Sequence, residues 1–419
     1  MSRDAEVIVV GAGPGGAAAA ARLALAGRRV LLLESAAFPR DKVCGDVLLP
    51  ELDSLLAQIN TGLGALAPDA HFISGCGFTS PSGHRVSGDF CDARGDVHPW
   101  RVLPRMKFDH RLALHAQRCG VELREGHRVR DVVWDARAKL NTVHVSTDRG
   151  EAELSAPIII GADGAASRVA RSRAMRPNAG DHHRNLCVTL RTYADWKNPQ
   201  PHFEVITDRA IGMGCGWIVP GPCGRANVGI GVIGYDRQTQ SAPLHAELKR
   251  LLGHRVDLSA APAPVGWQIP FGDLRRKAAA DGVLLVGDAA GFADPFTGHG
   301  IQTAIHSGLL AALAADDALS CGNLLASGPA LQRYERAWKR NLGHDFLLGQ
   351  WLQRAMQCAY GRPWLLDFVV GRAATSRRWA DRFMGLIGHA TRKNLVFRPG
   401  FVLDFIRSDA GWRPHRKET

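Results

Sequence analysis

The chain lacks any run of the roughly eighteen apolar residues that a membrane-spanning helix needs. It also lacks an apolar leader, because Asp4 and Glu6 stand where a secretory signal would be hydrophobic. These absences argue against an integral membrane protein and against a signal peptide. We therefore expect a cytoplasmic protein, with peripheral contact to a membrane left open.

Cysteine pairs are missing as well. The nine cysteines are an odd number, and no two of them are spaced as CxxC. This pattern argues against a disulfide framework and against structural zinc. We expect no metal ion in this protein.

Lysine is scarce, whereas arginine is abundant. The 419 residues include 52 basic and 40 acidic side chains, which gives a formal net charge of +12, and only nine of the basic residues are lysine. The basic residues are scattered, and no nucleic-acid recognition motif accompanies them. The charge therefore predicts no nucleic-acid partner and favours an anionic ligand: a phosphate-bearing cofactor, a diphosphate or an acidic carrier protein.

A βαβ unit is present at the start of the chain. Residues 5–10 predict a buried strand, residues 17–26 an Ala-rich helix and residues 28–34 a second buried strand. The turn between the first strand and the helix has the pattern GxGxxG. In this context the pattern is typical of a dinucleotide-binding fold.

Each glycine of this turn has a physical task. Gly11 permits the tight turn, Gly13 lets the backbone approach a pyrophosphate, and Gly16 lets the helix pack on the strand. Glu34 ends the second strand, where a carboxylate can accept hydrogen bonds from ribose hydroxyls. The helix N-terminus presents its positive end to the phosphates. The predicted phosphate-binding set is Gly11, Gly13, Pro14, Gly15 and Gly16.

A second glycine turn indicates FAD rather than NAD. The apolar strand 282–287 leads into Gly287-Asp288-Ala289-Ala290-Gly291, where Asp288 can hold the ribityl chain. The backbone over 295–300 can then pass close to a flavin ring. NAD dehydrogenases do not need such a distant second element. We therefore predict FAD, with contacts that include Gly287, Asp288, Pro295, Gly298, Gly300 and Ile301.

A third turn follows the apolar strand 157–161. Asp163 and Gly164 make this turn and are expected near FAD, and Ser167 is expected to cap the following helix. Arg168 is a candidate for binding an anionic group, although a plain surface arginine explains it equally well.

The order of these segments predicts the fold. Buried strands that suit one parallel sheet are separated by long insertions, and residues 183–270 alternate like antiparallel strands. We predict an α/β protein with a Rossmann-like FAD-binding domain assembled from split segments, an inserted antiparallel β-sheet substrate domain and a C-terminal helical extension. The expected boundaries are 1–55, 101–175 and 275–330 for the FAD-binding domain, 56–100 and 176–274 for the substrate domain, and 331–419 for the helical region.

In this order and separation, the three turns resemble those of the para-hydroxybenzoate-hydroxylase-like FAD superfamily, and finer segments resemble its geranylgeranyl reductase family. The segment Lys42-Val43-Cys44-Gly45 is similar to the family's Lys-x-Cys-Gly. Trp217-Ile218-Val219-Pro220 is similar to its Tyr-x-Trp-x-Phe-Pro stretch, and residues 294–301 to its Pro-x-x-Gly-Glu-Gly-Ile segment. The resemblance covers nearly the whole chain.

This resemblance implies an FAD-dependent oxidoreductase that transfers hydride from reduced FAD to a carbon–carbon double bond of a small, largely apolar substrate. Cys44 is then a candidate general acid, and a buried structural cysteine is the alternative. His299 is a candidate to relay a proton or to bind the flavin, or else faces solvent. The resemblance and the flanking residues add Arg40, Cys44, Gly45 and Arg105 to the FAD contacts, and Trp217, Pro220 and Trp267 to the substrate cavity.

Two departures keep other reactions open. His299 stands where the family has Glu, and Cys215 stands where an aromatic residue precedes Trp217 by two positions. The alternative is an FAD-dependent monooxygenase that hydroxylates or epoxidises through a flavin C4a-peroxide. Flavin halogenases carry Trp-x-Trp-x-Ile-Pro here, and Cys215 again replaces the first Trp, so halogenation comes third.

The sequence predicts no separate domain for binding NADPH or NADH, because no second GxGxxG is present. NADPH or NADH is therefore expected to visit transiently or to act through a partner flavin reductase. The substrate is expected to be prenyl, aromatic or bound to a carrier protein. The sequence predicts no particular oligomeric state.

The C-terminal region suggests an interaction surface. Over 377–407 basic residues interleave with apolar ones, a pattern that can meet a membrane surface or an acidic partner. Helices packed on the body with solvated arginines are the alternative. The residues are Arg377, Arg378, Arg382, Arg392, Lys393, Arg398 and Arg407, with Trp379, Phe383, Leu386, Ile387, Phe397, Phe401 and Phe405.

Overall fold

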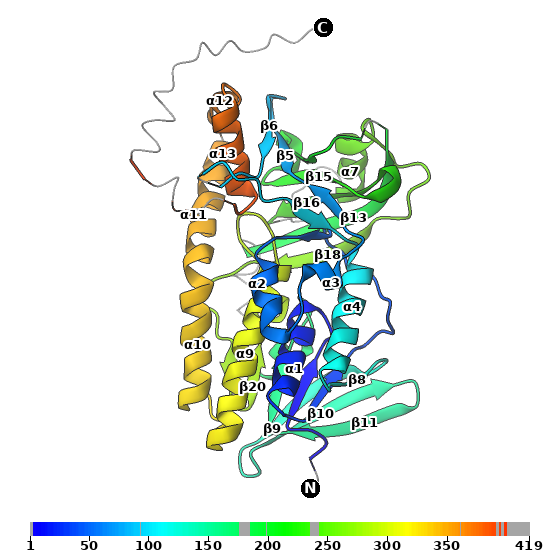
Figure 1. The fold of residues 1–419 in the computed structure, drawn as a ribbon, viewed down its shortest axis with the longest axis vertical. Coiled ribbons are helices and arrows are strands. Elements are labelled where there is room, and N and C mark those ends of the chain that lie inside the picture. Colours follow the sequence, from blue (N-terminus) through cyan, green and yellow to red (C-terminus); the bar gives the residue numbers. More distant parts are fainter. Residues whose placement is uncertain are drawn as a thin grey trace.

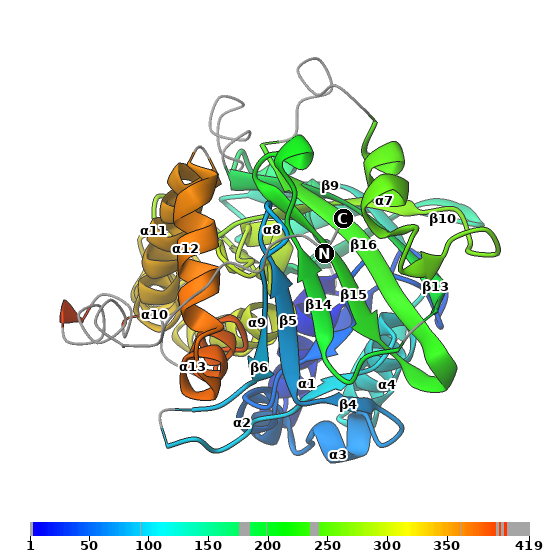
Figure 2. The same ribbon diagram turned by 90° about the horizontal axis from the view of Figure 1, so that it is seen from above.

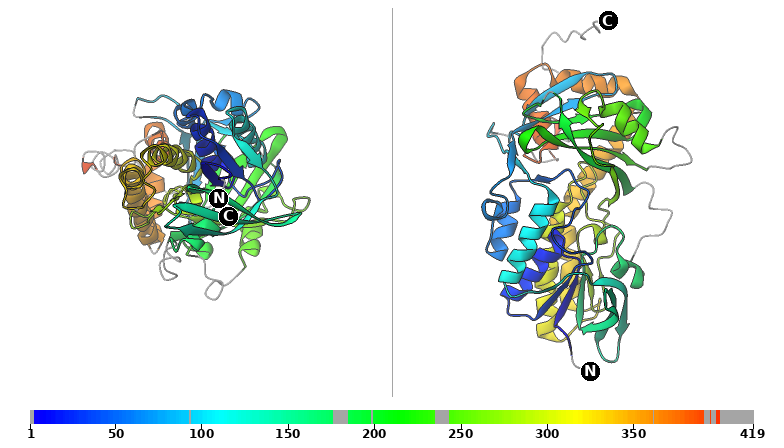
Figure 3. Two further views of the ribbon diagram at one scale, coloured as in Figure 1. Left: turned by 90° about the horizontal axis from the view of Figure 1, so that it is seen from below. Right: turned by 90° about the vertical axis from the view of Figure 1, so that its right-hand side faces the viewer.

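The computed structural model describes residues 3–399, apart from 93, 176–184, 198, 235–242, 361, 391–393, 395–397 and the side chains of a few further residues. The described chain forms an elongated molecule with one sheet in its lower half and a second sheet in its upper half (Figure 1). A row of C-terminal helices runs along one side of both sheets (Figures 1 and 3).

The lower sheet is the parallel sheet that the sequence predicts. Its strands lie in the order β19-β20-β12-β1-β2-β8, and all neighbours are parallel except β19 and β20. The four central strands are apolar and buried, as expected for a sheet covered on both faces. The strands are β1 (Val7–Val10), β2 (Val30–Leu33), β8 (Glu122–Arg124), β12 (Ile158–Gly161), β19 (Ala279–Ala280) and β20 (Val283–Leu285).

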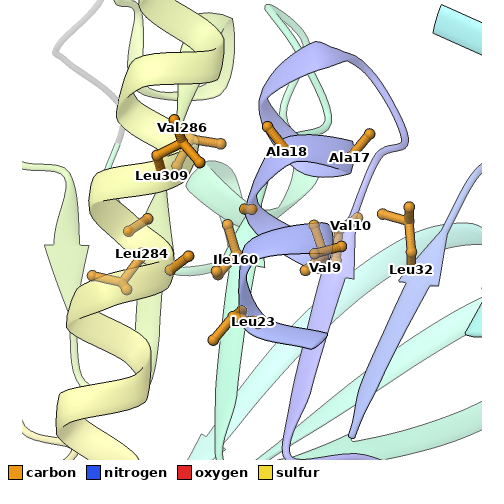
Figure 4. Close-up of a cluster of buried hydrophobic side chains, with 14 of the residues drawn as sticks. Val9, Val10, Ala17, Ala18, Leu23, Leu32, Ile160, Leu284, Val286 and Leu309 are labelled. Carbon is orange, nitrogen blue, oxygen red and sulfur yellow. The ribbon is translucent and has the colours of Figure 1, made fainter. Parts of the chain in front are cut away.

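Alanine makes the packing against this sheet unusually close. Helix α1 (Pro14–Leu25) packs against the strands and beside helix α9 (Ile301–Cys321), and its alanines from Ala17 to Ala21 are fully buried (Figure 4). A Cβ on Gly308 of α9 would lie 2.3 Å from the carbonyl oxygen of Gly15, so the two helix backbones meet without side chains between them. This packing places the N-terminus of α1 at the carboxyl ends of the parallel strands.

Further elements cover the lower sheet. Helix α1 and helix α4 lie on one face, and a three-stranded antiparallel sheet lies on the other (Figure 3). A small sheet of order β3-β7-β4 leads toward the upper half of the molecule. The elements are α2 (Leu52–Leu56), α3 (Leu63–Leu66), α4 (Arg105–Arg118), β3 (Val47–Leu48), β4 (His71–Ile73), β7 (Trp100–Val102), β9 (Arg128–Asp135), β10 (Leu140–Thr147) and β11 (Gly150–Ala156).

The upper sheet confirms the predicted antiparallel sheet. Its order is β17-β13-β16-β15-β14-β5-β6, β18 also pairs with β13, and every pair is antiparallel except β14 with β5. Helix α7 (Leu244–Leu252) packs on its outer face (Figure 2). The strands are β5 (Gly75–Thr79), β6 (Arg85–Asp89), β13 (Leu186–Trp196), β14 (Phe203–Ile206), β15 (Gly214–Pro220), β16 (Arg225–Ile233), β17 (Val256–Asp257) and β18 (Val265–Pro270).

The C-terminal helical region is confirmed as far as the structure describes it. It contains α10 (Pro329–Asn341), α11 (Gly343–Tyr360), α12 (Pro363–Ala373) and α13 (Arg377–Ile387). Helices α12 and α13 pack on β6 of the upper sheet. These contacts attach the C-terminal helices to the upper sheet.

The interaction surface predicted for this region needs a correction. Trp379 and Leu386 are buried, and Phe383 and Ile387 pack against the hydrophobic cluster between α13 and the upper sheet. Helical spacing turns these four side chains inward, so their apolar surface is already covered. Arg392, Lys393, Phe397, Phe401, Phe405 and Arg407 lie outside the described residues.

Candidate functional site

A cavity of about 970 Å³ lies between the carboxyl ends of the lower parallel strands and the inner face of the upper sheet. Open α/β sheets bind ligands at this edge. Most of the residues that the sequence singles out line this cavity, although they come from segments far apart in the chain. They are Gly11, Gly13, Pro14, Gly15, Glu34, Arg40, Cys44, Gly45, Arg105, Asp163, Gly164, Arg168, Trp217, Trp267, Gly287, Asp288, Gly298, His299, Gly300 and Ile301.

Three predicted contacts do not line the cavity, and each has a packing position instead. A Cβ on Gly16 would lie 1.9 Å from the carbonyl oxygen of Gly11, so Gly16 allows α1 to approach the turn. Pro295 packs near Gly349 of α11. Pro220 ends β15, where it pairs with Ala226.

The first glycine turn forms a cradle. Gly11 has a φ of +100°, which a residue with a side chain rarely adopts. Gly13 is the N-cap of α1, no side chain caps this helix end, and a Cβ on Gly13 would meet nothing within 4 Å. The helix therefore directs its first N–H groups toward open cavity space, an arrangement that suits an anion.

Charged side chains beside this cradle are tightly paired. Glu34 accepts hydrogen bonds from the backbone N–H of Ala12 at 3.2 Å and from Arg40 at 3.1 Å. Asp109 accepts from Arg40 at 2.7 Å and from Arg105 at 2.6 and 2.7 Å. Burial opposes the ionised form of Asp109, yet the two guanidinium groups hold its pKa below the usual value. Asp109 thus fixes both arginines at the cavity wall.

The third turn is held by its own aspartate. Asp163 accepts hydrogen bonds from the Ser167 hydroxyl and from the Arg168 backbone N–H, each at 2.6 Å. Ser167 accepts from the Ala170 N–H and caps helix α5 (Arg168–Ser172), as the sequence predicts. Burial raises the pKa of Asp163. Gly164 then passes along the cavity beside this rigid turn.

The second glycine turn and the loop after it also leave open space. Gly287, which starts α8 (Gly287–Ala290), has a φ of +54°. A Cβ on Gly298 would meet nothing within 4 Å, and one on Gly300 would lie 3.5 Å from Asp288. Asp294 holds the loop by accepting from the N–H groups of Phe296 and Thr297, both at 2.9 Å.

Cys44 lies at the cavity wall above a buried network. The Asn227 side-chain amide donates to the Cys44 carbonyl oxygen at 2.7 Å and to Asp46 at 2.8 Å. Asp46 also accepts from the Tyr193 hydroxyl at 2.5 Å, and Asn227 accepts from the Trp217 indole at 3.0 Å. This network joins the Cys44 segment to the cavity wall of the upper sheet.

The electrostatics keep the Cys44 thiol protonated. Burial raises its pKa, and the nearby Arg105 guanidinium opposes this shift without reversing it. A protonated thiol suits a proton donor, and a cation beside it would stabilise the thiolate that remains.

Lys42 is a cavity residue that the sequence analysis did not select. Its ammonium nitrogen lies 3.4 Å from the centre of the Trp267 ring and 3.9 Å from Asp288. Burial lowers the pKa of Lys42 to about 8, although Asp288 opposes this. The lysine was visible beside Cys44, but its burial depends on Trp267, which lies far away in the chain.

His299 meets a second histidine from the C-terminal region. The ring centroid of His299 lies 5.1 Å from the ring centroid of Trp100 and 5.0 Å from the ring centroid of His389. The Thr297 hydroxyl donates to Asp294, and it lies 3.0 Å from Nε2 of His389. No motif in the sequence marked His389.

The part of the cavity beyond Cys44 is apolar. Trp217 and Trp267 line it, as the sequence predicts for the substrate cavity. Further lining residues come from the upper sheet and from α11 and α13, and include Phe78, Phe203, Val205, Met356, Tyr360 and Ile387. Sequence analysis missed these residues because apolar side chains in strands and helices carry no local functional signal.

The residues present fit FAD. A helix N-terminus and side-chain-free positions at Gly13 and Gly298 suit a pyrophosphate and a flat ring that approach the backbone closely. Glu34 lines the same cavity, and so do the apolar side chains of the upper sheet. Among the described residues, no group of three or more His, Cys, Asp or Glu side chains could hold a metal ion, and no helix has the length and apolar character to cross a membrane.

Comparisons with known proteins agree with this geometry. Residues 4–315 match the FAD binding domain family. The menaquinone reductase of Mycolicibacterium smegmatis is 30% identical over 413 residues, with 92% of each chain covered. The digeranylgeranylglycerophospholipid reductase of Methanothrix thermoacetophila is 32% identical over 350 residues, which cover 81% of this chain and 84% of the relative. A solved geranylgeranyl bacteriochlorophyll reductase-like protein from Thermoplasma acidophilum has the same fold, with a TM-score of 0.73 and 22% identity. The match covers 98% of this chain and 97% of the solved chain.

Proposed function

The chain belongs to the geranylgeranyl reductase family of FAD-dependent oxidoreductases, and on this basis we propose that it reduces a carbon–carbon double bond of an apolar, prenyl-type substrate. The observation that carries the proposal is the Cys44 thiol, which burial keeps protonated, in the wall of the cavity that the glycine cradle and the apolar side chains share. One relative is named a digeranylgeranylglycerophospholipid reductase, and its geranylgeranyl substrate supports a prenyl substrate here.

The lower half of the molecule would hold the cofactor. Gly11, Gly13, Pro14 and Gly15 would bind the pyrophosphate, with Arg40 and Arg105 near it. Glu34 would accept from the ribose, Asp288 would hold the ribityl chain, and the backbone from Gly298 to Ile301 would lie along the flavin. The boundaries given above for the FAD-binding, substrate and helical parts belong to this proposal. Reduced FAD, when bound, supplies a hydride.

The protein side of the reaction is proton delivery. The Cys44 thiol would donate its proton to one alkene carbon as the other carbon accepts the hydride, so the double bond gains two hydrogen atoms. Arg105, fixed by Asp109, would stabilise the thiolate until solvent returns the proton. Trp217 and the apolar lining would orient the chain and exclude water. NADPH or NADH, either directly or through a partner flavin reductase, is proposed as the electron source.

Replacement of Cys44 tests this function. We expect Cys44→Ala to lower the rate of alkene reduction by about 10²–10⁴-fold, the usual contribution of a general acid. The measurement is anaerobic, with chemically reduced FAD enzyme, a short prenyl substrate and mass detection of the product two mass units heavier. The flavin spectrum and FAD affinity of the variant should match those of the wild type. An unchanged rate would remove Cys44 from the proposal, and no reduced product from the wild type would overturn the function.

Monooxygenation is the second candidate, because His299 and Cys215 depart from the family's pattern at the cavity. The two reactions differ in their use of oxygen. Turnover under labelled oxygen should leave the product without label if the protein is a reductase. Label in the organic product would instead establish the monooxygenase and remove the reductase proposal.

A further inference from the structure

Helices α11 and α12 expose large apolar side chains on the outer side of the molecule. Trp351 is 58% exposed and Trp364 is 67% exposed, and Leu347 and Phe368 are also exposed. Leu347, Trp351 and Arg354 follow helical spacing along α11, and Trp364 and Phe368 follow it along α12. The two helices pack against each other at the edge of the molecule (Figures 1 and 2).

This edge also carries positive charge. Residues 329–390 contain ten Lys and Arg against four Asp and Glu, an excess of six in a chain whose net charge is +12. Three of these cations are ion-paired: Arg333 with Asp317, Lys339 with Glu335, and Arg377 with Asp89 and Asp381. Arg354 and Arg362 are exposed, and the guanidinium of Arg354 lies 5.7 Å from the Trp351 ring centre.

The opposite side of α11 reaches the cavity. Met356 and Tyr360 line the apolar chamber, and the Tyr360 hydroxyl donates to the Gly214 carbonyl oxygen at 2.7 Å. Helix α11 therefore separates the exposed Trp351 from the chamber proposed for the substrate. An apolar substrate that leaves a lipid layer at this face would have to move past α11 to enter the chamber.

We propose that the α11–α12 face, composed of Leu347, Trp351, Arg354, Arg362, Trp364 and Phe368, docks on an anionic lipid bilayer. Tryptophan beside arginine suits the boundary between headgroups and acyl chains, and the positive charge attracts anionic lipid. A second copy of this chain fits less well, because a two-fold contact would bring the same positive face against itself. The delivery of an apolar substrate through this face rests on the proposed function, whereas docking itself does not.

Vesicle binding by the full chain tests the docking. We expect the wild type to co-sediment with mixed phosphatidylcholine–phosphatidylglycerol vesicles at low salt, and more weakly with pure phosphatidylcholine or at high salt. The double variant Trp351→Ser/Trp364→Ser should bind at least about tenfold more weakly, the effect of about 1.4 kcal/mol of lost burial. The matched control is Phe72→Ser, because Phe72 is an aromatic residue that is 54% exposed and has an arginine, Arg101, 5.3 Å from its ring centre.

Three results would overturn the docking proposal. The first is a wild type that does not bind the anionic vesicles at low salt. The second is a double variant that binds as tightly as Phe72→Ser. The third is a wild-type dimer, seen by sedimentation velocity, that the double variant dissociates, which would assign the face to a second copy.

A soluble substrate separates docking from catalysis. With a short, water-soluble prenyl substrate, the double variant should keep kcat/KM within about twofold of the wild type, whereas reduction of vesicle-borne substrate should fall about as much as binding. If the wild type reduces the soluble substrate without binding vesicles, docking is wrong and the function stands. If it binds vesicles and reduces neither substrate, the function is wrong and docking stands.

Discussion

At the scale of the residue, Lys42 shows how burial in the folded protein changes the pKa of a side chain. Its ammonium group lies over the Trp267 ring and 3.9 Å from Asp288, at the wall of the cavity. Burial lowers the pKa of Lys42 to about 8, well below that of a lysine in an unfolded chain. The folded state therefore releases this proton at a lower pH than the unfolded state does.

This difference predicts a pH dependence of stability in the FAD-free protein. Between about pH 8 and the ordinary lysine pKa near 10.4, the unfolded chain binds more protons, so the free energy of unfolding rises with pH through this range. Lys42→Met should abolish that rise, which we expect to be about 3 kcal/mol at about 1.4 kcal/mol per pH unit. Denaturant unfolding at a series of pH values measures it.

Removal of an exposed lysine is the control for this measurement. Lys107→Met removes a lysine that lies on the surface beside Asp69. If Lys42→Met and the wild type change stability in parallel from pH 8 to 10.5, the buried lysine does not titrate as described.

At the scale of the element, the turn from β1 into α1 contains two glycines with opposite surroundings. A Cβ on Gly16 would lie 1.9 Å from the Gly11 carbonyl oxygen, whereas one on Gly13 would meet nothing within 4 Å. Gly13 also has a φ of −73°, which alanine adopts freely. One glycine therefore serves packing within the fold, and the other leaves space for a ligand.

Alanine substitutions separate these two tasks. Gly16→Ala should destabilise the protein by roughly 3 kcal/mol, because the added methyl group forces α1 away from the turn. Gly13→Ala should leave the stability of the FAD-free protein nearly unchanged and weaken FAD binding at least about tenfold, because its methyl group would occupy the space proposed for the pyrophosphate. Thermal unfolding and fluorescence titration with FAD measure the two effects. Full FAD affinity in Gly13→Ala would contradict the assignment of the cradle.

At the scale of the whole molecule, the lower sheet, the upper sheet and the C-terminal helices all contribute residues to the cavity wall. The lower sheet contributes its turns, the upper sheet contributes Trp217, and the C-terminal helices contribute Tyr360 and Ile387. His389, just after α13, also contacts Thr297 in the loop that precedes α9. A ligand in this cavity therefore touches parts of the chain that would separate on unfolding.

FAD should stabilise the whole molecule as one unit. A ligand that binds only the folded state adds about 2.7 kcal/mol at a concentration one hundred times its Kd. We expect calorimetry to show one transition that moves to higher temperature as FAD is added. The shift should shrink in Gly13→Ala in proportion to its weaker binding. An FAD-saturated wild type whose midpoint does not move would contradict the assigned site.

The sequence by itself determined the parallel sheet, the glycine turns and the kind of cofactor. These features depend on neighbours in the chain: an apolar strand, a glycine that alone permits the turn, and a helix that begins directly after it. Gly11, Gly13 and Gly287 were therefore recognisable before the fold was known.

Only the tertiary structure decided which side chains share an environment. It buried Lys42 under Trp267, brought His389 to His299, turned Trp379 inward and left Trp351 exposed. It also showed that Gly16, Pro220 and Pro295 do not line the cavity, whereas the packing role of Gly16 was already predicted from the sequence. The physical reason is that burial and pKa depend on contacts between residues tens to hundreds of positions apart, and local periodicity carries no record of those contacts.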